Sequence, residues 1–321
     1  MRAVITGVAG QDGTLLARAL RAAGWEVLGL VRSRTRVEAA NPAEIRVVDL
    51  CDRETVRALI EQFQPQCVYH LAACHQSSED APDAVTDAEM IATNFTAAEI
   101  LADALLRVAP RCRLLLAGTS QMYTASEFDT VVDESTPIAP RSFYGRTKAW
   151  AREMLAHYRD HRGLFGGTAI LFNHESPLRP ERFVTRKISL AAARAKLGLP
   201  GTLEIQNAAA RVDWSAAQDV VDGMVRMLAA ERPADYVFAS GEAHTVQSAI
   251  EIAFDVVGED WHEHTALTAT PATNDRQRPA LVGNPARARR ELGWQSSMGL
   301  AEMLEEMVTA DVARLGQSVA C

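Results

Sequence analysis

ITGVAGQDG, residues 5–13, decides the fold of this chain, because it sets three glycines between a short apolar run and a helical segment. The run Ala3–Thr6 is typical of a first strand, and helical spacing begins near Thr14. Glycines let the backbone turn tightly and approach a pyrophosphate, and a helix that follows presents unpaired N–H groups to an anion. A tight turn without a ligand is the alternative, but the position between strand and helix favours a dinucleotide site. The cofactor contacts predicted at this turn are Gly7, Gly10, Gln11, Asp12 and Gly13.

Short apolar runs alternate with longer amphipathic stretches through the first half of the chain. The predicted strands are Ala3–Thr6, Val27–Val31, Ile45–Val48, Cys67–Ala72, Leu114–Ala117 and Thr168–Phe172. The predicted helices between them are Thr14–Ala23, Glu54–Gln62, Ile91–Val108 and Gly145–Arg159. This alternation predicts an α/β Rossmann fold, a doubly wound parallel sheet.

The second half of the chain is less regular, with helices expected at Phe183–Leu197, Ala217–Ala230 and Ala301–Leu315. We expect a dinucleotide-binding domain over residues 1–168 and a smaller, mainly substrate-binding C-terminal lobe over residues 169–321. Within that lobe, residues 217–242 are expected to return to the layers of the sheet. Open α/β folds bind ligands at the carboxyl edge of the sheet, which such a lobe would cover.

The composition excludes several classes of function. The chain has 321 residues, 48% of them hydrophobic, with 41 acidic against 33 basic side chains and a net charge of −8. A folded, acidic chain without a basic stripe is not expected to bind nucleic acid or a membrane. Its five cysteines lack CxxC spacing, so we expect no metal site and no disulfide framework. No apolar run approaches the ~20 residues of a membrane span, and no signal peptide precedes the first strand, so a cytoplasmic location is expected.

The end of the second predicted strand indicates which dinucleotide is bound. An NAD site places an acidic residue there, whereas this strand ends in LVRSR, residues 30–34. Arg32 suits a 2′-phosphate, so NADP is favoured over NAD; a solvated run of Arg32, Arg34 and Arg36 is the alternative. Further contacts to the cofactor are expected after the third and fourth strands, from Asp49, Leu50, Leu71, Ala72 and Ala73.

The catalytic signal is a Tyr-x-x-x-Lys pair downstream of a Thr. Tyr144 and Lys148 share one face of a predicted helix, and Thr119 follows the fifth predicted strand. An ammonium group beside a phenol would lower the pKa of the phenol, so Tyr144 can act as a base toward a sugar hydroxyl. Lys148 would also reach the nicotinamide ribose. Such a pair also occurs by chance in helices, but together with the glycine turn it indicates an oxidoreductase site.

At these residues the chain resembles the extended short-chain dehydrogenase/reductase superfamily and, within it, the GDP-mannose 4,6-dehydratase family. The similar stretches are ITGVAGQDGTLLA at 5–17, LAGTSQMY at 116–123, PRSFYGRTKAW at 140–150, ILFNHESPLRPERFVTRKI at 170–188, DW at 213–214 and GNPARARRELGW at 283–294. The resemblance covers nearly the whole chain and implies a nucleotide-diphosphate sugar as substrate, with a GDP-hexose favoured.

One departure from that family bears on the reaction. The resemblance implies that residues matching Thr119, Tyr144 and Lys148 oxidise C4 of the hexose and that a Glu then removes the C5 proton, but Gln121 stands at the position of the Glu. An amide cannot act as a general base. We therefore favour an epimerase that works through a transient C4 ketone. A dehydratase with His75 or Cys74 as the base, a 4-ketosugar reductase and a non-catalytic nucleotide-binding regulator remain the alternatives.

The resemblance also implies the substrate contacts, which are Asn173, Glu175, Arg179, Val184, Lys187, Arg211 and Arg278. Arg186 and Lys187 on a solvated helix face are the alternative for that segment. The family's Arg-Asp-Trp becomes Arg211-Val212-Asp213-Trp214, which moves the Arg by one residue. A homodimer is expected through the helices Ile91–Val108 and Tyr144–His161, because these helices pair across two-fold axes in the superfamily.

Overall fold

The computed structural model describes residues 1–33, 44–75, 85–267 and 279–319. Within them, seven parallel strands form one sheet in the order β11-β7-β5-β4-β1-β2-β3. The strands are β1 (Arg2–Thr6), β2 (Glu26–Val31), β3 (Glu44–Val47), β4 (Cys67–His70), β5 (Arg113–Ala117), β7 (Gly166–Leu171) and β11 (Tyr236–Phe238). The order reverses at β1, which is the topology of a doubly wound sheet. The predicted α/β Rossmann fold is confirmed.

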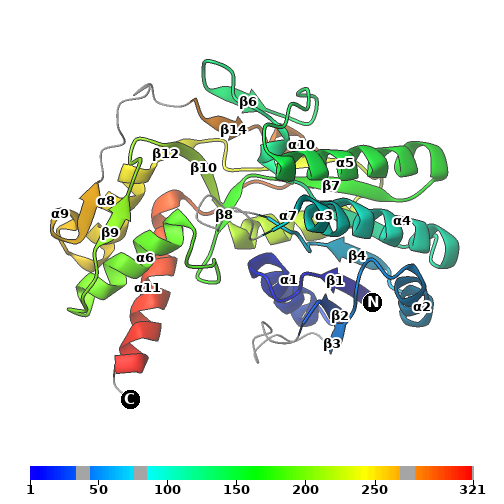
Figure 1. Ribbon diagram of the computed structural model, residues 1–321, viewed down its shortest axis with the longest axis horizontal. Coiled ribbons are helices and arrows are strands. Elements are labelled where there is room, and N and C mark those ends of the chain that lie inside the picture. Colours follow the sequence, from blue (N-terminus) through cyan, green and yellow to red (C-terminus); the bar gives the residue numbers. More distant parts are fainter. Residues whose placement is uncertain (34–43, 76–84, 268–278, 320–321) are drawn as a thin grey trace.

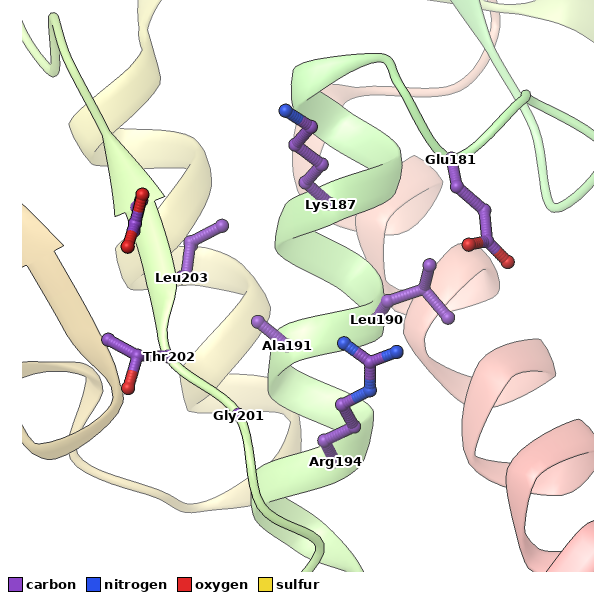
Figure 2. A pocket seen from close by; sticks show the side chains of 9 residues that line it. Glu181, Lys187, Leu190, Ala191, Arg194, Gly201, Thr202 and Leu203 are labelled. Atoms are coloured by element: carbon purple, nitrogen blue, oxygen red, sulfur yellow. The ribbon is translucent and has the colours of Figure 1, made fainter.

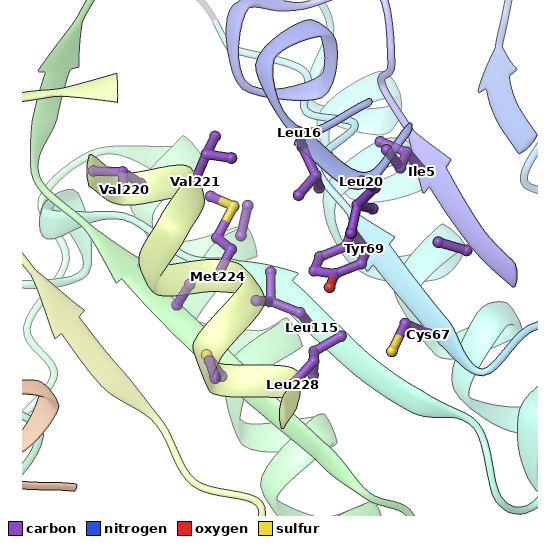
Figure 3. Close-up of a cluster of buried hydrophobic side chains, with 14 of the residues drawn as sticks. Ile5, Leu16, Leu20, Cys67, Tyr69, Leu115, Val220, Val221, Met224 and Leu228 are labelled. Carbon is purple, nitrogen blue, oxygen red and sulfur yellow. The ribbon is translucent and has the colours of Figure 1, made fainter. Parts of the chain in front are cut away.

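Helices cover both faces of this sheet (Figure 1). On one face lie α1 (Gln11–Ala22), α7 (Ala217–Ala229) and α10 (Ala286–Leu292), and on the other lie α2 (Arg53–Phe63), α4 (Ala97–Val108) and α5 (Phe143–Arg162). Figure 3 shows Leu16 and Leu20 of α1 and Met224 of α7 packed over Ile5 and Tyr69 of the strands. Because these side chains of α1 are buried on the sheet, the glycine turn from Gly7 to Gly13 lies at the edge of the sheet where β1 and β4 end.

The helix expected at Ile91–Val108 is not continuous. The structure has α3 (Asp87–Ile91), one π-helical turn over Ala92–Thr96 and then α4. The apolar spacing of the segment continues through the π turn, so the sequence pattern does not reveal this change. Such turns occur often at functional sites. Here the turn carries a buried Asn94 toward the end of β4.

The remaining elements form a smaller lobe at the carboxyl edge of the sheet (Figure 1). Its helices are α6 (Val184–Lys196), α8 (Val246–Val257), α9 (Trp261–His264) and α11 (Leu300–Val319), and its strands include β9 (Leu203–Ile205) and β13 (Thr265–Leu267). Ile188, Trp214, Phe254 and Leu304 are among the buried side chains of its core. Two short sheets connect the lobe to the Rossmann part: β8 (Asn173–Glu175) with β10 (Arg211–Ala216) and β12 (Ala243–Thr245), and β6 (Thr130–Val132) with β14 (Leu281–Gly283).

The division of the chain at residues 168 and 169 stays a prediction. Residue 168 lies inside β7, whose hydrogen bonds to β5 continue to Ala169. The segment expected to return to the sheet, 217–242, holds α7 and β11, which pack on the sheet and extend it.

Candidate active site

The glycine turn forms a cradle that admits no side chain at two of its positions. Gly7 has a φ of +71°, and a Cβ there would lie 2.7 Å from the backbone nitrogen of Ala72. A Cβ on Gly13 would lie 2.4 Å from the carbonyl oxygen of Gly7. Gly10 is the N-cap of α1 and makes no side-chain cap, so the first N–H groups of the helix face the turn unblocked by a side chain. Such a helix end suits a pyrophosphate.

Gln11 and Asp12, two predicted cofactor contacts, are engaged with β8 and the loop that follows it. Gln11 Nε2 donates to the carbonyl oxygen of His174 (3.0 Å), and Ser176 Oγ donates to Gln11 Oε1 (2.8 Å). Asp12 pairs with His174 Nε2 at 3.0 Å. Burial alone would lower the pKa of His174, but the charge of Asp12 and the hydrogen bonds to Asp12 and the Phe172 carbonyl together raise that pKa above its ordinary value. The two side chains therefore connect the glycine turn to the smaller lobe.

The other predicted cofactor residues surround the ends of β2, β3 and β4. Arg32 is exposed just after β2, close enough for its charge to lower the pKa of Cys74. Asp49 accepts from the Cys51 backbone (2.9 Å), and Leu50 packs against the core beneath α2 and α4. Leu71, Ala72 and Ala73 follow β4, where the Ala72 N–H donates to Thr6 Oγ1 (3.1 Å). Arg34 and Arg36 lie outside the described residues.

Thr119, Tyr144 and Lys148 come together at the end of β5. Ser142 caps the amino terminus of α5 through the Gly145 N–H (3.0 Å), which places Tyr144 in the first turn and Lys148 one turn later. The Thr119 side chain hydrogen-bonds to the Tyr144 hydroxyl. Lys148 Nζ donates to the carbonyl oxygen of Ala117 (2.9 Å) and lies 5.9 Å from the centroid of the Tyr144 ring.

The expected lowering of the phenol pKa by Lys148 is not found. Burial raises the pKa of Tyr144 to about 12 against the lowering effect of the Thr119 hydrogen bond. Burial also lowers the pKa of Lys148 to about 8. The ammonium group is directed at the Ala117 carbonyl, so desolvation dominates both groups.

The side chains of His75 and Gln121 lie next to each other beside Tyr144. Gln121 Nε2 is 3.4 Å from His75 Nε2, and Ser142 Oγ donates to Gln121 Oε1 (2.9 Å). The His75 ring stands edge-on to the Tyr144 ring, with 4.7 Å between centroids and 88° between planes. An imidazole thus lies close to the residue at the position of the family's Glu.

Cys74 is the weaker of the two predicted bases. Burial and the nearby Glu89 charge raise the pKa of its thiol, against the lowering effect of Arg32, so the thiolate is disfavoured at neutral pH. Its backbone is held by Asn94, whose Oδ1 accepts from the Cys74 N–H and whose Nδ2 donates to the Cys74 carbonyl oxygen, both at 2.9 Å. Asn94 also donates to Thr147 of α5 (3.0 Å). This clamp was missed in the sequence; a polar residue on an otherwise apolar helix face was its signal.

A cavity of about 340 Å³ opens beside Gln121. Two of the predicted substrate contacts line it, Asn173 and Arg211, together with Arg141, which sequence reasoning missed. Arg211 forms an ion pair with Asp129, whose other oxygen accepts from the Ala280 N–H (2.9 Å). The full lining is Ser120, Gln121, Tyr123, Thr124, Ala125, Arg141, Ser142, Phe172, Asn173, Arg211, Val212, Asp213, Pro279, Ala280 and Leu281.

Two other predicted substrate residues are engaged within the protein. Glu175 is 2% exposed and accepts from Thr185 Oγ1 (2.6 Å), and its carboxylate pairs with Arg179 at 3.0 Å. Arg179 also lies over the Phe183 ring, 3.6 Å from its centroid. In the described structure Glu175 is therefore a buried structural carboxylate, and burial raises its pKa.

The α6 segment divides its residues between two environments. Lys187 lines a second cavity of about 290 Å³ between α6 and β9, where Figure 2 shows it with Arg194 on the helix and Leu203 opposite. Val184, one turn before Lys187, begins the helix and is half-buried. The solvated face considered for Arg186 is wrong: its side chain is 1% exposed and pairs with Asp311 of α11. Arg278 lies outside the described residues.

Among the described residues, no group of His, Cys, Asp and Glu side chains has the arrangement of a metal site. The described helices include none that is long and apolar enough to cross a membrane.

Comparison with known proteins shows which protein family the chain matches. Residues 4–307 match the family model described as GDP-mannose 4,6 dehydratase. The chain is 34% identical to GDP-mannose 4,6 dehydratase 2 of Arabidopsis thaliana, covering 97% of this chain and 86% of the plant protein. It is 35% identical to the GDP-mannose 4,6-dehydratase of Sinorhizobium fredii, covering 98% and 97% of the two chains.

Solved structures share the same fold at lower identity. RMD from Pseudomonas aeruginosa complexed with NADPH has a TM-score of 0.81 at 23% identity and covers 98% of this chain and 99% of its own. The UDP-glucose 4-epimerase of Thermus thermophilus in complex with NAD has a TM-score of 0.81 at 23% identity and covers 97% and 99%. Fold and site together define an extended short-chain dehydrogenase/reductase. More narrowly, the chain belongs to the GDP-mannose 4,6 dehydratase family.

Proposed function

We propose that this nucleotide-sugar-modifying enzyme is an NADP-dependent 4,6-dehydratase that acts on GDP-mannose and uses His75 as its elimination base. The observation that carries the proposal is the imidazole of His75, 3.4 Å from the Gln121 amide and edge-on to Tyr144. An imidazole at that place can take up a proton as a general base, which an amide cannot do. Gln121 in the sequence favours an epimerase, but the dehydratase alternative has better support, because relatives about one-third identical over the whole chain carry the dehydratase name.

The residues present fit an NADP cofactor. The side-chain-free turn at Gly7 and Gly13 would hold the pyrophosphate at the start of α1, and Arg32 after β2 would meet the 2′-phosphate. Lys148, charged below its lowered pKa of about 8, would hold the nicotinamide ribose. When bound, NADP would accept a hydride from C4 and return it to C6, and its cationic nicotinamide would lower the raised pKa of Tyr144.

Two side chains of the protein, Tyr144 and His75, then carry out the proton transfers. Tyr144, hydrogen-bonded to Thr119, takes the proton of the C4 hydroxyl as the ketone forms. The ketone acidifies the neighbouring C5–H bond, and His75 Nε2 takes that proton. The imidazolium gives the same proton to the C6 hydroxyl, which leaves as water. Once the hydride is on C6, C5 takes a proton from solvent and Tyr144 releases its proton to solvent, so over the cycle one water is lost and the cofactor is unchanged.

The product mass tests the proposal. Incubation with GDP-mannose and a catalytic amount of NADP is expected to yield a nucleotide sugar lighter by one water, with no net NADPH formed. A product of unchanged mass with C4 inverted would establish the epimerase in its place. Stoichiometric consumption of NADPH with a 4-ketosugar would establish the reductase, and no turnover of GDP-, UDP- or ADP-hexoses would favour the nucleotide-binding regulator.

The preference for NADP has its own test at Arg32. A hydrogen bond to a charged phosphate contributes about 1.5–3 kcal/mol. Arg32→Ala is therefore expected to weaken NADP binding roughly 10-fold or more while leaving NAD binding unchanged, as measured by titration calorimetry. Arg111→Ala is the matched control, because Arg111 is exposed at the opposite end of the sheet, just before β5. Equal loss for both dinucleotides would contradict the assignment.

We propose in addition that the sugar and diphosphate occupy the cavity beside Gln121 and that the base of the nucleotide lies toward Lys187. Arg141 and Arg211 both line the first cavity, where Arg211 is paired with Asp129, and guanidinium groups suit the oxygens of a diphosphate. The second cavity, between α6 and β9, combines Lys187 and Arg194 with Glu181 and Glu204, which suits the donors and acceptors of a purine edge.

A homodimer through α4 and α5 is the assembly that we propose. Trp150 of α5 is 42% exposed and stands edge-on to Phe95 and Phe143 at 6.5 and 6.0 Å between ring centroids. Aromatic side chains grouped on a helix face are typical of the core of an interface. Trp150→Glu is expected to give a monomer by light scattering, with the same circular dichroism. A wild-type monomer at micromolar concentration would contradict the dimer.

A further inference from the structure

Ser142 has one hydroxyl proton, and it donates that proton to a hydrogen bond with Gln121. The Ser142 oxygen accepts the N–H of Gly145 (3.0 Å) as the cap of α5, and the hydroxyl proton points to Gln121 Oε1 (2.9 Å). The carbonyl oxygen of the amide therefore faces the helix. Its NH₂ group faces the other way, toward His75.

The orientation of that amide decides which nitrogen of His75 carries the proton. Gln121 Nε2 only donates, and His75 Nε2 lies 3.4 Å from it. An imidazole nitrogen that faces a donor must present its lone pair, so the proton of the neutral ring belongs on Nδ1. We infer that Ser142 and Gln121 are positioning residues that hold His75 in the tautomer whose Nε2 lone pair is directed at the Gln121 amide on the cavity wall.

Two further contacts keep the ring in place. The Tyr144 ring packs edge-on against it, and Asn94 holds both backbone polar groups of the preceding Cys74. Because Asn94 also donates to Thr147, it connects the segment after β4 that carries His75 to the helix that carries Tyr144. The inference rests on the proposed role of His75 as base.

The same geometry gives a reason for an amide at position 121. A carboxylate there would only accept hydrogen bonds, so it would draw the proton of the ring onto Nε2 and occupy the position from which His75 must act. The amide keeps the Nε2 lone pair in place and leaves it to a substrate that displaces the long 3.4 Å contact. Gln121 and His75 thus work as a matched pair.

The test separates this role of Ser142 from its role as a helix cap. Ser142→Gly removes the hydroxyl, and glycine costs a helix cap only a few tenths of a kcal/mol. Ser142→Thr keeps both the cap and the donor. In the NADP-loaded enzyme, long-range proton–nitrogen NMR of His75 reads the tautomer without turnover, and kcat and KM for GDP-mannose are measured in parallel.

We expect Nε2 to be unprotonated in the wild type and in Ser142→Thr, and the tautomers to be mixed in Ser142→Gly. We expect kcat to fall about tenfold in Ser142→Gly with KM within about twofold, because only proton transfer is affected. A wild-type ring protonated on Nε2, or a Ser142→Gly variant with unchanged tautomer and kcat, would overturn the inference. If the tautomer is as expected but His75→Asn still dehydrates GDP-mannose, the proposed role of His75 as base fails while the positioning pair stands.

Discussion

Replacing Tyr144 with phenylalanine is expected to lower kcat by about 10²–10⁴-fold, the range that a positioned acid or base contributes. The change removes only the hydroxyl that meets Thr119 and leaves the ring that packs against His75. KM for GDP-mannose should change little, because the phenol oxygen acts in proton transfer more than in binding. Single-turnover absorbance of NADPH, together with steady-state kinetics, measures both quantities.

The matched control for that change is Tyr158→Phe on the same helix. Tyr158 donates to Glu99 (3.4 Å) on the side of α5 that packs against α4, so its hydroxyl is remote from the cavity. It should keep full activity. A Tyr144→Phe enzyme within threefold of wild type would remove Tyr144 from the chemistry and, with it, the interpretation of the site as an oxidoreductase site.

Replacing His75 with asparagine is expected to stop dehydration and to leave oxidation at C4. Asparagine keeps a polar side chain of similar reach but cannot take a proton, so loss of water should fall by about 10²-fold or more. C4 oxidation depends on Thr119, Tyr144 and Lys148 and should persist as NADPH absorbance in a single turnover. Exchange of the C5 proton with deuterated solvent should disappear, as read by mass spectrometry.

Cys74→Ala is the control for the histidine variant, since it changes the neighbouring side chain but not the backbone that Asn94 holds. It should dehydrate at the wild-type rate. If Cys74→Ala were inactive and His75→Asn active, the thiol would be the base in spite of its raised pKa. If His75→Asn, Cys74→Ala and the variant with both changes all dehydrate GDP-mannose, neither residue is the elimination base.

The parts of the site that are local in sequence were predictable. The turn from Gly7 to Gly13 needs only a strand, three glycines and a helix, and the pairing of Tyr144 with Lys148 needs only the spacing of one helical turn. The fold class follows from alternating runs whose burial the sheet confirms. Chain order alone is enough for these features.

The parts that depend on packing were not predictable. His75, Gln121 and Ser142 come from three separate segments, and nothing in the spacing places Gln121 between the other two. The sequence predicts Glu175 as a substrate contact and allows Arg186 on a solvated helix face, yet each is buried against a partner that only the folded lobe supplies. The raised pKa of Tyr144 likewise follows from desolvation, which sequence spacing does not report.

The hydrogen bonds that join Gln11 and Asp12 with His174 and Ser176 affect thermal unfolding of the protein. They cross between the helix that starts the cofactor cradle and the strand and loop that open the smaller lobe, and each is largely buried. Breaking them to release one lobe would leave buried polar groups unpaired, which costs about 1–3 kcal/mol for each group. The two halves should therefore unfold in one cooperative transition, and a ligand bound to either half should raise the melting temperature of both.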